Sequence, residues 1–208
     1  MELAVLNKTG KDTGRKVKLS SEVFGVEPND HAIYLDVKLF LANQRQGTHK
    51  SKDKSEITGS TRKLKKQKGT GTARAGSIKS GVFRGGGRFF GPQPRDYSFK
   101  LNKKVRALAK KSALTYKLKE EGVKILEAVE YKAPKTKDFA SLVKGLEVEG
   151  KKTLFILPGS NDNFYLSGRN IPKTKIVTIQ DVNTYDVLNA DKIILLEESV
   201  KGLEDLLG

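Results

Sequence analysis

One stretch of the chain, residues 44–95, is too poor in apolar side chains to build a hydrophobic core. Its 52 residues include nine apolar ones and ten of the twenty glycines. The remaining residues are roughly 44% apolar, which is ordinary for a folded domain. Ordering a residue's backbone costs about 1–2 kcal/mol, and little apolar burial is available here to offset that cost. The segment therefore needs a partner outside its own side chains.

The positive charge of the protein is concentrated in the same part of the chain. Residues 44–111 contain twenty lysines and arginines against Asp53, Glu56 and Asp96, a net charge of +17. The rest of the chain has a net charge of −1, so this block carries the whole excess. Charge at this density, in one place, favours a polyanionic partner, with nucleic acid as the leading candidate.

Hydrophobic periodicity elsewhere predicts an α/β domain. Strands are expected over 2–7, 16–19, 123–126, 153–157, 175–179 and 192–196, and helices over 30–43, 102–121, 137–146, around 163, 184–189 and 200–207. Asp30 and Asn102 are the expected N-caps of the first two helices, and Gly122 the left-handed stop of the second. Four strand-then-helix units in succession predict a Rossmann-like, mostly parallel sheet with helices on both faces.

The basic segment is then a long extended loop inserted between two helices, since it far exceeds usual connections of about 2–8 residues. We expect residues 1–43 and 97–208 to form a single globular domain and residues 44–96 to form the loop. No apolar run approaches the ~18 residues of a membrane span, and the N-terminus lacks the pattern of a signal peptide. These features predict a soluble, cytoplasmic protein.

Catalytic and cofactor signatures are weak. The chain has no cysteine and two histidines, His31 and His49, without other ligands at metal-binding spacing, so no metal site is expected. Residues 69–77 lack the lysine of a nucleotide phosphate loop, and no dinucleotide fingerprint follows a strand, so no cofactor is expected. Residues 157–162 are expected to form a strand-to-helix turn capped by Ser160 or Asn161. The chain is predicted not to be an enzyme.

Cations interleaved with glycine, serine, threonine and phenylalanine are the stronger signal. Cations neutralise phosphates, glycine lets backbone amides approach them, and aromatic or guanidinium planes stack on bases. RNA is favoured over DNA because no helix-turn-helix, zinc or zipper pattern is present. The candidate RNA-binding residues are Arg45, Lys50, Lys52, Lys54, Arg62, Lys63, Lys65, Lys66, Lys68, Arg74, Lys79, Arg84, Arg88, Arg95, Lys103, Lys104 and Arg106.

The order and spacing of several motifs resemble a known family, the universal large-subunit ribosomal protein called L-four, in its bacterial type. The motifs lie at 43–49, 61–63, 67–77, 84–87, 90–97, 103–106, 112–114 and 185–192. Two departures stand out. The family commonly has Pro-Trp before the Gln-Lys-Gly-Thr-Gly run and Arg after its second glycine, where this chain has Leu64-Lys65 and Thr72.

The resemblance implies a structural protein of the large ribosomal subunit, whose loop threads into the ribosomal RNA and supports assembly. It also implies that the loop tip lines the constriction of the nascent-peptide tunnel, opposite the loop of the protein called L-twenty-two. The tip residues are then Gln67, Lys68, Gly69, Thr70, Gly71, Thr72, Ala73 and Arg74. Neighbouring large-subunit proteins are the expected partners, with no membrane contact and no homo-oligomer, in the cytoplasmic ribosome.

Two other functions remain open at this stage. A free-standing RNA-binding protein or RNA chaperone would bind RNA without sedimenting with large subunits. An RNA-modifying enzyme would need a cofactor pocket, for which the sequence shows no fingerprint.

Overall fold

The computed structural model describes residues 1–129, 131 and 133–208, which form two units. The first unit, here called the sheet domain, contains Met1–Leu41 and Lys100–Gly208. The second, here called the basic segment, contains Ala42–Phe99. No described helix is long and apolar enough to cross a membrane.

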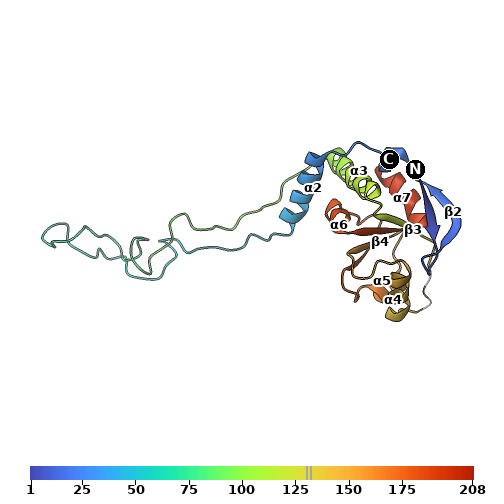
Figure 1. Cartoon of the computed structure of the whole chain (residues 1–208). Coiled ribbons are helices and arrows are strands. Elements are labelled where there is room, and N and C mark those ends of the chain that lie inside the picture. Colours follow the sequence, from blue (N-terminus) through green and yellow to red (C-terminus); the bar gives the residue numbers. More distant parts are fainter. Residues whose placement is uncertain (130, 132) are drawn as a thin grey trace. The chain divides into compact units, whose positions relative to one another are not determined.

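The regular elements alternate along the C-terminal half of the chain as the periodicity predicts (Figure 1). The strands are β1 (Glu2–Leu6), β2 (Asp12–Lys18), β3 (Val123–Leu126), β4 (Thr153–Leu157), β5 (Thr174–Thr178) and β6 (Lys192–Leu196). The helices are α1 (Ser21–Phe24), α2 (Asp30–Asn43), α3 (Lys103–Lys119), α4 (Thr136–Gly145), α5 (Asp162–Gly168), α6 (Thr184–Asn189) and α7 (Glu197–Leu207).

The described strands form one mixed sheet in the order β2-β1-β3-β6-β4-β5. β1 and β2 pair antiparallel, and every other neighbouring pair in that order is parallel. The prediction of an α/β domain is confirmed. The last strand, β6, lies between β3 and β4, so the chain crosses the sheet rather than adding strands outward from one starting point.

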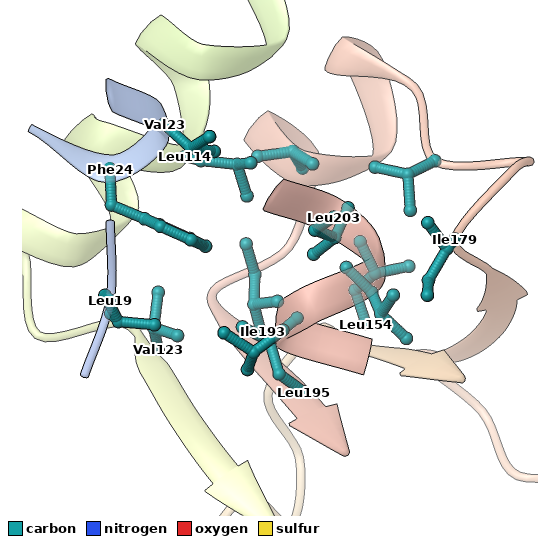
Figure 2. Packing of buried hydrophobic residues seen from close by; sticks show 14 of the residues in the cluster. Leu19, Val23, Phe24, Leu114, Val123, Leu154, Ile179, Ile193, Leu195 and Leu203 are labelled. Atoms are coloured by element: carbon teal, nitrogen blue, oxygen red, sulfur yellow. The ribbon is translucent and has the colours of Figure 1, made fainter. Parts of the chain in front are cut away.

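The central strands bury side chains on both faces, because successive residues of a strand point to opposite sides. In β4, Leu154 and Ile156 join a cluster with residues of α1, α3, α6 and α7, part of which Figure 2 shows. Phe155 and Leu157 join a second cluster with residues of α4 and α5. There the rings of Phe139, Phe155 and Phe164 pack with centroids 5.1–5.9 Å apart. Helices therefore cover both faces of the sheet.

One of the two predicted helix caps is wrong. The side chain of Asn29, not Asp30, caps α2, because its Oδ1 accepts the backbone N–H of Ala32 at 2.9 Å. Asp30 is the first residue of α2, and its carboxylate accepts the hydroxyl of Tyr116 at 2.6 Å instead. Asn102 is the N-cap residue of α3, as predicted, although its side chain makes no capping hydrogen bond.

The predicted stop of α3 at Gly122 is displaced by one residue. The left-handed residue is Glu121, at φ 51°, and Gly122 donates its N–H to the carbonyl of Lys117 at 2.8 Å. Glu121 also donates to Leu118, which completes a Schellman motif. Glycine avoids crowding at 122, since a Cβ there would lie 3.0 Å from the Lys117 oxygen and 3.3 Å from that of Asp191.

Other boundaries differ in ways that the side chains explain. β2 begins at Asp12, ahead of the predicted strand at 16–19, because Asn7 closes a short turn by accepting the N–H groups of Thr9 and Lys11. The short helix α1 was not predicted. Asn161 caps α5, as expected, and α7 begins three residues earlier than its apolar pattern indicates.

Candidate RNA interface

The basic segment runs out and back as two chain arms that are hydrogen-bonded at intervals. The N–H of Arg95 reaches the carbonyl of Gly47, that of Ser51 the carbonyl of Pro92, and that of Arg88 the carbonyl of Lys52. These bonds measure 3.0–3.1 Å, and farther out Leu64 donates to Gly76 at 2.7 Å. The segment contains no strand, so isolated backbone bonds rather than a continuous ladder hold the arms together.

A stacked cluster ties the two arms together where the segment begins. The guanidinium carbon of Arg45 lies 3.6 Å from the ring centroid of Tyr97, and that of Arg95 lies 4.4 Å from it. The Arg95 guanidinium lowers the pKa of the Tyr97 phenol. Gly47 is required beside this cluster, because a Cβ there would lie 2.1 Å from the Arg95 oxygen. The flat faces of both arginines are therefore partly occupied within the protein.

Acidic side chains hold the next stretch. Glu56 pairs with Lys50 and accepts the backbone N–H of Asp53 at 3.2 Å. This pairing lowers the pKa of the Glu56 carboxyl and raises that of the Lys50 ammonium. The carboxylate of Asp53 accepts the side-chain amide of Gln93 from the other arm at 3.2 Å. Both carboxylates therefore stabilise the conformation of this stretch of the basic segment.

The outer turn of the segment is open. Every residue of 61–74 is exposed, which includes the whole predicted tip. Two side-chain bonds cross the turn: the Lys63 ammonium donates to Gln67 at 3.0 Å and that of Lys65 to Thr72 at 2.6 Å. Gly69 and Gly71 have φ values of 80° and 63°, and beyond their chain neighbours no described residue lies within 4 Å of where a Cβ would be. They shape the turn while leaving its backbone accessible.

Most predicted cations of the basic segment have no carboxylate near them. Among the described residues, Lys50 is the one of the fourteen that lies within 4 Å of an acidic oxygen. Lys79 is partly buried and the other thirteen are exposed. Phe89 and Phe90, between two arginines of the returning arm, are 58% and fully exposed. The segment thus presents unneutralised cations and bare aromatic rings together.

The three predicted cations of the sheet domain have different environments. Lys103 and Lys104 are exposed in the first turn of α3. Arg106 is not a free cation, because its Nε lies 3.6 Å from the carboxylate of the buried Asp36 on α2. One turn farther along α3, burial lowers the pKa of Lys110. This face of α3 is basic, but Arg106 already contacts Asp36 and Lys110 is partly buried.

Three structural residues of these surfaces were not singled out by sequence reasoning. Asp36 lies on the buried face of α2, where its carboxylate also accepts the hydroxyl of Thr184. An acid at helical spacing from Ile33 and Leu39 is the signal that could have found it. The others are Tyr97, whose ring both arginines contact, and Glu56, three residues after Asp53.

The described residues contain no cluster of three or more acids or histidines able to hold a metal. Within the basic segment, a hollow of about 570 Å³ is lined by Leu64, Ile78 and cations, an arrangement for contacting an anion rather than for catalysis. The lining cations are Arg62, Lys63, Lys65 and Lys66.

Comparison with known proteins decides the family. The model of the ribosomal protein L4/L1 family matches residues 17–206. The chain belongs to this family. It is 56% identical over 208 residues to the large ribosomal subunit protein uL4 of Christiangramia forsetii, with both chains fully covered. The protein of that name from Phocaeicola vulgatus is 58% identical over the full length of both chains. That from Amoebophilus asiaticus is 58% identical over 205 residues, 99% of this chain and 98% of the relative.

Membership confirms the resemblance drawn from the motifs. Proteins of the L4/L1 family are structural components of ribosomes, so the chain is a ribosomal protein and not an enzyme. Because the chain is not an enzyme, the exposed cations of the basic segment are interpreted as a binding surface rather than as part of a catalytic site.

Proposed function

We propose that the chain binds large-subunit ribosomal RNA through its basic segment, supports assembly of the subunit, and lines the nascent-peptide tunnel with residues 67–74. The sheet domain, with its Rossmann-like arrangement of a mostly parallel sheet between helices, serves as the scaffold. In functional terms we divide the chain as the sequence predicts, with 1–43 and 97–208 as the domain and 44–96 as the RNA-threading loop.

The observation that carries this proposal is the set of thirteen loop cations without a carboxylate partner among the described residues. Cations packed this densely repel one another in water, and counter-ions or phosphates must neutralise them. Neutralisation by RNA phosphates releases counter-ions and makes binding strongly dependent on salt. Two narrow, glycine-rich arms suit the crevices of a folded RNA better than the surface of a duplex.

The internal contacts of the basic segment indicate different roles for its different cations. Arg45 and Arg95 stack on Tyr97 and stiffen the start of the loop, and Lys50 is paired with Glu56. Lys68 and Arg74 lie in the exposed outer turn without such partners among the described residues. We assign the first group to shaping the loop and the second to contacts with phosphates or the tunnel.

The partners follow from this role. We propose contact with ribosomal RNA and with neighbouring large-subunit proteins, including the tunnel protein called L-twenty-two, in cytoplasmic ribosomes and without a homo-oligomer. A free RNA chaperone is the competing function, and it would be found away from the particle.

Sedimentation and site-specific cross-linking test the proposal together. A photo-reactive side chain placed at Thr70 should cross-link to an arrested nascent chain in purified large subunits. The same group at Ser141, an exposed position on α4, is the matched control and should not. Protein that sediments apart from large subunits, or incorporated protein that never cross-links from position 70, would overturn the tunnel assignment.

A further inference from the structure

Helix α2 has a second face that the basic segment does not explain. Ala32, Ile33, Asp36 and Leu39 are buried on one side of the helix. His31, Tyr34, Lys38 and Leu41 are exposed, and their spacing of three, four and three residues aligns them along the opposite side. Tyr34 is 57% exposed and Leu41 45% exposed.

The side chains of this outer face are arranged around the tyrosine ring. The rings of His31 and Tyr34 are stacked, with centroids 6.4 Å apart and planes 27° apart. The Lys38 ammonium lies 5.6 Å from the centroid of the Tyr34 ring. A cation held by an aromatic ring that remains more than half exposed combines the two groups that bind a nucleotide: a ring to stack on its base and a charge for its phosphate.

The neighbouring helix determines which kind of partner fits. α3 is joined to α2 by the Tyr116–Asp30 hydrogen bond and the Arg106–Asp36 ion pair. It carries seven lysines and arginines and no acidic residue between Lys103 and Lys119. α3 packs on the buried side of α2, and its seven cations give this end of the sheet domain a positive field. An anionic partner is favoured over a neutral protein surface.

We propose that the outer face of α2 is a second RNA site, on which an unpaired base stacks against Tyr34 while Lys38 contacts its phosphate. The inference rests on the proposed function in that its ligand is RNA. It adds a site in the sheet domain, made of residues outside the basic segment, and specifies single-stranded rather than double-stranded RNA.

The absence of tryptophan from the sequence allows a local test on the full-length chain. Tyr34→Trp introduces a single indole on the exposed face, and Tyr165→Trp is the matched control, since Tyr165 is a 47% exposed tyrosine on α5. The probe is a short, dye-labelled oligoadenylate, with an RNA duplex of equal length in a parallel titration. Dye anisotropy reports all binding, and indole emission reports stacking at one position.

We expect single-stranded RNA to quench the indole at 34 in a saturable manner, while duplex RNA leaves it unquenched and the indole at 165 responds to neither. Adding Lys38→Gln should shift the quenching to higher RNA concentration and reduce its salt slope by about 0.7, the value for one phosphate contact on a single strand.

The outcomes separate this site from the proposed function. If dye anisotropy rises while the indole at 34 is unquenched, or is quenched no more than that at 165, RNA binds elsewhere and the second site is wrong. If anisotropy does not rise for any variant, RNA binding itself fails.

Discussion

The two units of this protein reach an ordered structure by different physical routes. The sheet domain buries two apolar clusters, one on each face of its sheet. The basic segment has one buried residue, Gly87, and depends on scattered backbone bonds and a few side-chain contacts. The net contribution of one intramolecular hydrogen bond to stability is about 0.5–1.5 kcal/mol. The few bonds of the segment therefore cannot offset the entropy lost on ordering so many residues. The domain should therefore be stable alone, whereas the segment should depend on RNA.

Substituting one phenylalanine in each unit tests this difference most sharply, because both units contain the residue. Phe155→Ala should lower the free energy of unfolding by about 3–5 kcal/mol, since the ring is fully buried between Phe139 and Phe164. Phe90→Ala, in the basic segment, should change it by less than about 0.5 kcal/mol because the ring is fully exposed. Urea unfolding followed by circular dichroism measures both. Similar losses would mean that the segment shares the core.

The next largest effect on stability is expected for Asp36, a buried acidic residue of the sheet domain. Asp36→Ala removes the acceptor of the Thr184 hydroxyl and the partner of Arg106, and should cost about 1–3 kcal/mol of unfolding free energy. Asp30→Ala, on the same helix but exposed, is the control and should cost less than about 1 kcal/mol. Equal costs in urea unfolding would show that burial of Asp36 does not matter.

Removing the outer part of the loop tests the independence of the two units. Deletion of Lys63–Val82 takes away no residue of either apolar cluster, so the melting midpoint should stay within about 2 °C of the parent. The truncated chain should still join assembling subunits, through the remaining arms and the basic face of α3, and the defect should appear inside the particle. A chain that fails to fold after this deletion would show that our division of the molecule is wrong.

The smallest effect on stability and the most local effect on function are expected at Lys68. Lys68→Glu changes the charge of the exposed turn by two units, so unfolding should be unaffected while drug inhibition and nascent-chain stalling change in mutant ribosomes. Lys68→Gln, which removes the charge without reversing it, should give a weaker change of the same kind. If ribosomes with fully incorporated Lys68→Glu match wild type in both assays, Lys68 does not face the constriction.

Regular elements of the sheet domain were predictable because their apolar periodicity matches their burial. The bounds of β3, β4, β6 and α6 agree with the predicted ranges. Helix ends were less predictable, since Asn29 and Asp30, or Glu121 and Gly122, are neighbours that can play the same role. Which one caps or turns depends on tertiary contacts, such as the hydroxyl of Tyr116 on Asp30.

The position of the basic segment was predictable from composition, but its internal bonds were not. Cations and glycines in one block indicate an RNA partner whatever their arrangement. The stacking of Arg45 on Tyr97 joins residues about fifty apart, and the Asp53–Gln93 bond joins residues forty apart. Such pairings depend on the register of the two arms, which no local pattern encodes.

Amide hydrogen exchange of the free chain and of purified large subunits tests most directly whether RNA orders the basic segment. In the free chain we expect residues 50–90 to exchange rapidly while β3, β4 and β6 stay protected, because their amides lie in the covered sheet. In the subunit, the same segment should become protected. Slow exchange throughout 50–90 in the free chain would contradict the account, since the segment would then be ordered without RNA.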